Sequence, residues 1–262
     1  MAGAARVRPE WTGHVPSATQ PIFASGIVLT MSPSKVLATM ALGRHEEFLE
    51  VTRPSFERYA ALHGYDLRIP EDDPAPERRN KQWGKVAFIN QLLPTCDLLV
   101  WIDADAAIVD PSVDIATTLP PRRFLGLVEH HYDGQCVPNT GVMVVRSGRR
   151  SRQFFEQMWG MTQYLETRWH DNAAALEMIG YEFDPDATPM RCQPGTTTPW
   201  LRRTQILGSE WNSVPQDLST APRILHFTGA YPFAERLERL RAAVSRQTTR
   251  VPLEAQARSR IP

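Results

Sequence analysis

This sequence contains few lysines and few cysteines, and it has no net charge. Only three of its 262 residues are lysine and only three are cysteine. Lysine plus arginine and aspartate plus glutamate each total 29, so the formal net charge is zero. Without an overall field, the protein has no general electrostatic attraction for nucleic acid or an anionic membrane surface. We therefore expect no nucleic-acid partner, although a metal or a few placed residues can still create a local anion site.

The three cysteines are widely spaced, at Cys96, Cys136 and Cys192. An odd count at such spacing predicts reduced thiols, and neither a disulfide framework nor a zinc knuckle. Long apolar runs are missing as well. The apolar stretch at residues 22–31 is too short to span a bilayer and lacks a signal-peptide arrangement. We expect a cytoplasmic protein without a membrane span.

The composition is that of a globular protein, with 42% hydrophobic and 22% charged residues. Residues 1–33 mix Pro, Gly, Ser and Thr without a period, and residues 249–262 are polar. Both are predicted to be loose end segments. Residues 34–248 are predicted to form a single domain, because a chain of this length can bury a sizeable core.

Strand-like and helix-like patterns alternate within that domain. The expected strands cover 35–42, 65–69, 97–102, 124–128, 141–145 and 224–227, and the expected helices cover 46–63, 83–93, 152–164, 171–179 and 234–244. This alternation predicts an α/β fold with a mostly parallel sheet flanked by helices. Ligands bind such sheets beyond the carboxyl ends of the strands.

The strongest chemical signal is an apolar strand that runs directly into two carboxylates. In the segment LLVWIDADAAI, Asp103 and Asp105 follow Ile102. Side chains alternate along a strand, so the two carboxylates can point the same way. Their mutual repulsion falls if a divalent cation bridges them, and oxygen ligands with open positions suit Mg²⁺ or Mn²⁺ bound to substrate phosphates. The alternative is a strand that ends in a solvated acidic turn.

Three weaker signals follow along the chain. Asn139 and Gly141 open a strand in PNTGVMVV, where a sugar contact and ordinary turn chemistry are both open. Asp171 stands at a helix start in WHDN, either as a substrate contact or as a cap. His226 ends an apolar run in ILHFTG, where a lone histidine is usually structural. In combination with the Asp-x-Asp segment, it becomes a candidate third metal ligand.

Taken in order, these segments resemble a family of glycosyltransferases. The segments are WGKVAFINQLLPTCDLLVWIDADAAI, NTGVMVVRSG, WHDNAAALEMIG and ILHFTG, and the resemblance covers residues 35–229. Their order is similar to that in the galactosyl-, mannosyl- and xylosyltransferases of fungal mannan and plant xyloglucan synthesis. The chain departs from that group at Asp171-Asn172, where the group usually has an acid with glutamine. It is also shorter, and the amino-terminal anchor of the Golgi enzymes is not expected.

The resemblance implies the GT-A fold, a divalent cation that is usually Mn²⁺, and sugar transfer with retention of anomeric configuration. By that similarity, the metal ligands are Asp103, Asp105 and His226. The implied donor contacts are Asp103, Ala104, Asp105, Asn139, Gly141 and Gly229. The implied catalytic residues are Lys85, Asp171 and Asn172, with Lys85 near the donor or its phosphates.

We therefore predict a metal-dependent transferase that moves a hexose or pentose from a UDP- or GDP-sugar to an acceptor hydroxyl. No unambiguous nucleophile is evident, which favours same-face attack over a covalent intermediate. A small-molecule acceptor is predicted, with a glycan as the alternative. The Pro- and Thr-containing segment 185–204 is expected to be a long irregular loop, which either covers a compact acceptor or merely packs on the sheet. Two alternatives stay open: a mutase that needs no acceptor, and a non-catalytic nucleotide-sugar-binding protein. The oligomeric state is also open.

Overall fold

The computed structural model describes residues 34–75, 79–188, 190–229 and 231–249. Apart from residue 249, the predicted end segments 1–33 and 249–262 lie outside these ranges, and the single domain over residues 34–248 stays a prediction. Within the described ranges, no helix is long and apolar enough to cross a membrane.

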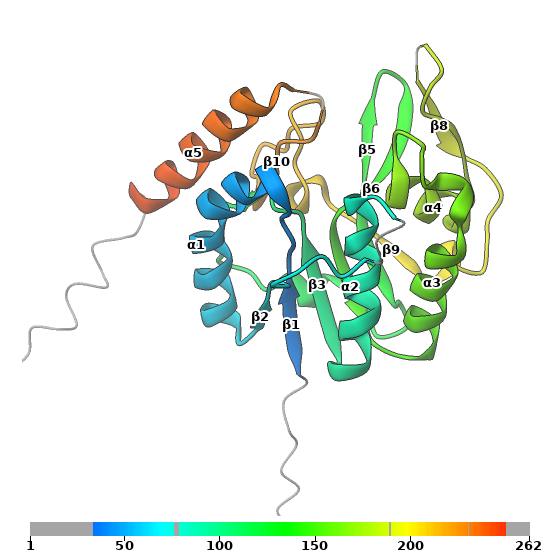
Figure 1. Ribbon diagram of the computed structural model, residues 1–262, viewed down its shortest axis with the longest axis horizontal. Helices are drawn as coiled ribbons and strands as arrows, with labels where there is room; N and C mark the ends of the chain where they lie inside the picture. Colours follow the sequence, from blue (N-terminus) through cyan, green and yellow to red (C-terminus); the bar gives the residue numbers. More distant parts are fainter. Residues whose placement is uncertain (1–33, 76–78, 189, 230, 250–262) are drawn as a thin grey trace, which may run out of the picture. The chain divides into compact units, whose positions relative to one another are not determined.

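A six-stranded sheet lies at the centre of the described fold (Figure 1). In spatial order its strands are β2 (Asp66–Arg68), β1 (Lys35–Ala38), β3 (Leu98–Ile102), β6 (Gln135–Arg146), β5 (Leu125–Tyr132) and β9 (Thr204–Leu207). Strand β6 runs antiparallel to both its neighbours, and the other pairings are parallel. The predicted α/β fold with a mostly parallel sheet is confirmed.

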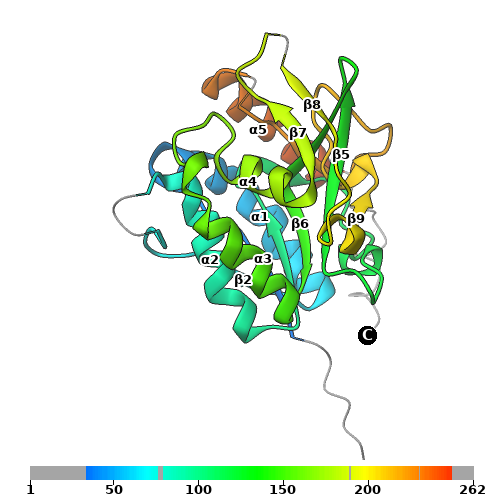
Figure 2. The ribbon, with the colours of Figure 1, turned by 90° about the vertical axis from the view of Figure 1, so that its right-hand side faces the viewer.

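Helices cover both faces of this sheet. Figures 1 and 2 place α2 (Gly84–Leu92), α3 (Arg149–Gly160) and α4 (His170–Ile179) over one face, and α1 (Glu46–His63), with α5 (Phe233–Thr249) beside it, on the other side. The side chains of β3 alternate accordingly. Leu99 and Trp101 pack in the core with α2, α3 and α4, whereas Leu98, Val100 and Ile102 pack in the core with α1. A strand buried on both faces has an unbroken apolar sequence, which made β3 recognisable.

Two short two-stranded sheets accompany the main one. Strand β4 (Ala106–Ile108) pairs antiparallel with β10 (Ile224–His226), and this register places His226 opposite Ala106. Strand β7 (Tyr181–Asp184) pairs antiparallel with β8 (Arg191–Pro194). The β4–β10 pairing therefore brings the histidine motif beside the Asp-x-Asp segment, although the two are far apart in the sequence.

The prediction of an irregular segment over residues 185–204 is wrong in part. Residues 191–194 form β8, and Thr204 begins β9 at the edge of the main sheet. In β8 only Cys192 is buried, and the other three side chains are exposed. Such a strand has no apolar alternation to indicate it, and its pairing with β7 decides the structure.

Several predicted boundaries also need correction. The first strand ends at Ala38 instead of residue 42, and the helix predicted at 152–164 lies at 149–160. Strands β5 and β6 are longer than their apolar stretches because they form one hairpin. Its turn residues Asp133 and Gly134 both have positive φ, 51° and 70°, which is the conformation that an Asp-Gly pair favours in a two-residue turn.

Two glycines that end helices offer a matched test of the packing beside β8. Gly180 follows α4 with φ 89°, and Gly64 follows α1 with φ 70°. A Cβ on Gly180 would lie 1.9 Å from the Thr196 carbonyl oxygen, whereas a Cβ on Gly64 would have no neighbour within 4 Å. We expect Gly64→Ala to lower the free energy of unfolding by about 1–2 kcal/mol through backbone strain alone. Gly180→Ala should cost more, as measured by urea denaturation, and equal losses would contradict the close packing.

Candidate active site

The Asp-x-Asp segment forms a tight connection between two strands. Asp103 directly follows β3, and Ala106 begins β4. The Asp103 N–H donates to the Gly141 carbonyl of β6 at 2.8 Å, and the Ala106 N–H donates to the Asp103 carbonyl at 3.0 Å. The Phe227 N–H donates to the Asp105 carbonyl at 3.0 Å. The segment is thus held between β6 and the end of β10, at the carboxyl end of β3, where ligands bind in folds of this kind.

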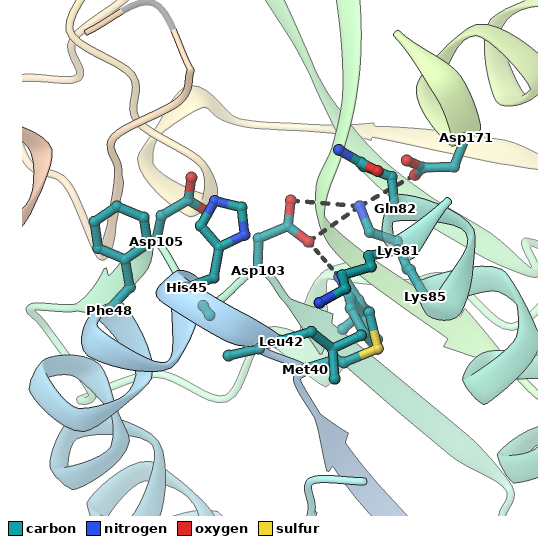
Figure 3. Close-up of a pocket in the computed structure, with 13 residues that line it drawn as sticks. Met40, Leu42, His45, Phe48, Lys81, Gln82, Lys85, Asp103, Asp105 and Asp171 are labelled. Carbon is teal, nitrogen blue, oxygen red and sulfur yellow. Dashed lines mark hydrogen bonds and ion pairs between the residues drawn. The ribbon is translucent and has the colours of Figure 1, made fainter. Parts of the chain in front are cut away.

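A cleft opens at this point (Figure 3). Its walls come from the segment after β1, the start of α1, the start of α2 and the Asp-x-Asp segment, and the start of α4 contributes one carboxylate. Five of the predicted site residues line it: Lys85, Asp103, Ala104, Asp105 and Asp171. The other five, Asn139, Gly141, Asn172, His226 and Gly229, are not part of its lining.

Lys85 lies between two carboxylates, as the dashed lines in Figure 3 show. Its Nζ is 3.0 Å from Asp103 Oδ1 and 3.1 Å from Asp171 Oδ2, and it donates to the Thr140 carbonyl at 3.3 Å. Burial lowers the pKa of a lysine, but Asp103 and Asp171 outweigh burial here and raise the pKa of Lys85. Burial also raises the pKa of Asp103, against the opposing effect of Lys85. Lys85 therefore stays protonated and lies between two carboxylates of the cleft wall.

Asp105 is paired with Arg236 of α5 and faces His226. Arg236 Nη2 donates to Asp105 Oδ2, and Arg236 Nε donates to the Phe227 carbonyl at 2.7 Å. His226 Nε2 is 3.2 Å from Asp105 Oδ1. Burial opposes ionisation of this carboxyl, yet His226 and Arg236 hold the pKa of Asp105 well below its usual range. The expected repulsion between the two carboxylates is present, because Asp105 raises the pKa of Asp103, but each carboxylate also has a cationic partner.

Asn212 determines how the His226 ring is oriented. The Gly141 N–H and Asn212 Nδ2 both donate to Asn139 Oδ1, at 2.7 and 2.9 Å. Asn212 Oδ1 therefore faces His226 Nδ1, at 2.9 Å. Because an amide oxygen only accepts, Nδ1 carries a proton, and in the neutral ring the Nε2 lone pair points to Asp105. Histidines that bind a metal through one ring nitrogen usually have such a hydrogen bond at the other.

This arrangement fits a divalent cation. Asp103, Asp105 and His226 each offer one ligand atom, and the three atoms lie within 4.8 Å of one another. Carboxylate oxygens and a neutral imidazole suit a metal such as Mn²⁺. A cation that both His226 Nε2 and Asp105 Oδ1 ligate requires the neutral ring, with its proton on Nδ1 toward Asn212.

Asp171 and Asn172 have different surroundings. Asp171 lies in the first turn of α4, where Oδ2 accepts a hydrogen bond from Thr140 Oγ1 at 3.0 Å. Asn172 binds the backbone of β6: Oδ1 accepts from the Thr140 N–H at 2.9 Å, and Nδ2 donates to the Pro138 carbonyl at 3.2 Å. This orientation favours a positioning role for Asn172. Its catalytic role, like the donor role of Gly229, stays a prediction.

Arg236, Asn212 and His45 also belong to this site, although no sequence pattern indicated them. Arg236 lies in a helix that the sequence indicated, but no motif distinguished it from the other basic residues there. Asn212 belongs to a short segment without any recognisable pattern. His45 lines the cleft next to α1, where burial lowers its pKa and the charge of Asp105 acts in the opposite direction.

The sequence matches no protein-family model and no curated protein. The fold, in contrast, is similar to solved glycosyltransferases. One is involved in glycosylation of the major capsid of PBCV-1, and it aligns with 80% of this chain and 100% of its own at 16% identity, with a TM-score of 0.61. The galactosyltransferase LgtC, solved with donor and acceptor sugar analogs, aligns with 84% of this chain and 99% of its own at 13% identity, with a TM-score of 0.52.

A third similar structure is the glycosyltransferase GlyE of Streptococcus pneumoniae. It aligns with 82% of this chain and 64% of its own at 12% identity, with a TM-score of 0.51. These similarities confirm the predicted GT-A fold of glycosyltransferases. The narrower resemblance to the fungal mannan and plant xyloglucan enzymes stays a prediction.

The close contact between Gly141 and His226 generates a test of the site's geometry. A Cβ on Gly141 would lie 2.2 Å from His226 Cε1 and 2.7 Å from Nδ1. We expect Gly141→Ala to displace the ring, break its bond to Asn212, and lower the free energy of unfolding by roughly 1–3 kcal/mol. Imidazole ¹⁵N NMR spectra should show the Nδ1–H form of His226 in the wild type and a changed signal in the variant.

Gly160→Ala is the matched control, because no atom lies within 4 Å of a Cβ at that position. Its histidine spectrum should equal that of the wild type. An unchanged His226 signal in Gly141→Ala would show that the ring is not confined as described.

Proposed function

We propose that this chain is a metal-dependent glycosyltransferase that moves a sugar from a UDP- or GDP-sugar to an acceptor hydroxyl. One observation carries the proposal: in a GT-A fold, the two Asp-x-Asp carboxylates and a histidine whose Nε2 faces Asp105 meet at the carboxyl end of β3. The resemblance to the fungal and plant transferases supports the same function.

Asp103, Asp105 and His226 are proposed to hold Mn²⁺ or Mg²⁺. When bound, such an ion neutralises negative charge on the donor's diphosphate and on the departing nucleotide. The protein adds charge of its own beside these ligands, from Lys85 at Asp103 and from Arg236 at Asp105. Both cations are buried, so their effect on a phosphate is weakly screened by solvent.

Asp171 and Lys85 are proposed to face the transferred sugar. Both line the cleft, and each of its described lining carboxylates, Asp103, Asp105 and Asp171, already has a cationic partner. This arrangement favours same-face attack with retention. Lys85 and Asp171 would orient sugar hydroxyls through hydrogen bonds, and the acceptor hydroxyl would pass its proton to the leaving phosphate.

A small acceptor remains part of the proposal, but the segment 185–204 does not support it. None of the described residues from that segment lines the cleft. The wall formed by Met40, Leu42 and Phe48, together with the His45 ring, offers apolar surface instead. We propose that an apolar part of the donor or acceptor lies against this wall.

Product analysis tests the function directly. The protein is incubated with a panel of UDP- and GDP-sugars and Mn²⁺, with and without a mixture of small hydroxylated acceptors, and the products are separated by mass and chromatography. A new glycoside that forms only with acceptor supports the proposal. An isomerised sugar in the donor-only sample indicates a mutase. Tight nucleotide binding without transfer, isomerisation or donor hydrolysis indicates a binding protein.

The proposed metal ligands predict the behaviour of Asp105→Asn. Calorimetry should show that UDP or GDP binding is no longer strengthened by Mn²⁺. The metal-free variant should also be less stable, on the order of 1–3 kcal/mol, because the buried Arg236 loses its charged partner. Asp186→Asn, at an exposed position outside the cleft, is the control and should change neither property. Mn²⁺-dependent binding that survives in Asp105→Asn would refute the assignment.

A further inference from the structure

Four arginines line one hollow on the surface, outside the cleft. Arg122 and Arg123 precede β5, and Arg202 and Arg203 precede β9, which pairs with β5 in parallel. The two arginine pairs therefore meet because the starts of neighbouring parallel strands lie at the same end of a sheet. Two prolines and a glutamine complete the lining.

Two of these arginines are held in place by crossed hydrogen bonds to backbone. Arg123 Nη1 donates to the Arg202 carbonyl, and Arg203 Nη1 donates to the Arg122 carbonyl at 3.3 Å. Each bond uses one of the five N–H groups of a guanidinium, so most donors stay available. Arg122 and Arg202 are exposed, and in the described part of the chain their side chains donate no hydrogen bond to protein.

The part of the chain that the structure describes places no acidic partner at this hollow. Among the described residues, no carboxylate forms an ion pair with any of the four arginines. Four like charges in one concave site repel one another, and an anion with several oxygens removes that cost. Guanidinium groups match phosphate oxygens in geometry and can bind them through two N–H groups at once.

The hollow and the cleft lie at opposite ends of the sheet. Strand β5 runs in the same direction as β3, because both are antiparallel to β6. Leu125 of β5 and Leu99 of β3 are both paired with Val145, so they lie at the same height in the sheet. Along the shared strand direction, Arg123 lies two residues before this height and Asp103 four residues after it. About six residue steps separate the two levels, or roughly 20 Å along the strands. This exceeds the screening length of about 8 Å at physiological ionic strength.

We infer that the arginine hollow is a second binding site, which takes the phosphate or diphosphate group of a ligand other than the donor in the cleft. The zero net charge of the chain does not oppose this, because the positive charge is local. The inference rests on Arg122, Arg123, Arg202 and Arg203 alone and does not depend on the proposed function. The phosphate can belong to a free small molecule or to a lipid headgroup, and the two sources are distinguishable.

Isothermal titration with inorganic pyrophosphate, in a buffer with a chelator and without divalent metal, tests the site. The double variant Arg122→Ala/Arg202→Ala removes the two exposed guanidiniums and leaves the crossed backbone bonds intact. We expect it to weaken pyrophosphate binding by roughly tenfold or more. Arg149→Ala/Arg150→Ala removes the same charge from exposed positions at the start of α3 and should bind like the wild type.

Three results would overturn the inference: no pyrophosphate binding by the wild type in this titration, equal affinity in Arg122→Ala/Arg202→Ala, or an equal loss in both arginine pairs. A cosedimentation assay with vesicles of phosphatidylcholine, with and without phosphatidic acid, then identifies the source. Sedimentation that requires phosphatidic acid and is lost in Arg122→Ala/Arg202→Ala supports a lipid headgroup. Pyrophosphate binding without such sedimentation supports a free phosphate ligand.

Discussion

Two carboxylates stand at the carboxyl end of a buried strand, and each is paired with a cation from a different part of the chain. Lys85 reaches Asp103 from the start of α2, and Arg236 reaches Asp105 from α5. Buried charges of one sign are costly unless they are paired, so the packing of these two helices and the charge state of the site depend on each other. The strand, both helices and the cleft form one electrostatic unit.

In the metal-free protein, this pairing already balances the charge of the two carboxylates. Two carboxylates without cationic partners would attract any cation. Here each carboxylate is already paired with a cation, so the proposed divalent ion would have to share Asp103 and Asp105 with Lys85 and Arg236. Cation binding and the positions of these two side chains are therefore linked, and a diphosphate that accepts hydrogen bonds from Lys85 and Arg236 would favour both.

Backbone and amide contacts complete the arrangement on the other side. The side chain of Asn139 joins the Gly141 N–H to Asn212, and Asn212 orients His226. The missing Cβ of Gly141 leaves the space that the ring occupies. The Asn-Thr-Gly segment, which the sequence suggested as a sugar contact, thus has a structural explanation of its own. Its contact with donor remains a prediction.

The sequence by itself determined the features that depend on local burial. The run LLVWI predicted β3 because both of its faces are covered, and the period of apolar residues over 46–63 predicted α1 with the observed bounds. Asp103 and Asp105 were recognised as candidate site residues because they directly follow this strand. Strand β8 was missed because three of its four residues are exposed and carry no apolar pattern. The full β5–β6 hairpin was missed because its added residues, 129–132 and 135–140, are mostly polar.

Only the tertiary structure decided which distant charges meet. Arg236 and Asn212 entered the site because β10 pairs with β4 and α5 packs beside α1, and neither residue has a local pattern that distinguishes it. The net charge of zero likewise gave no indication of four arginines in one hollow, since a sum over the chain contains no positions. Burial leaves a periodic trace in sequence, whereas the pairing of charges depends on which strands and helices lie side by side.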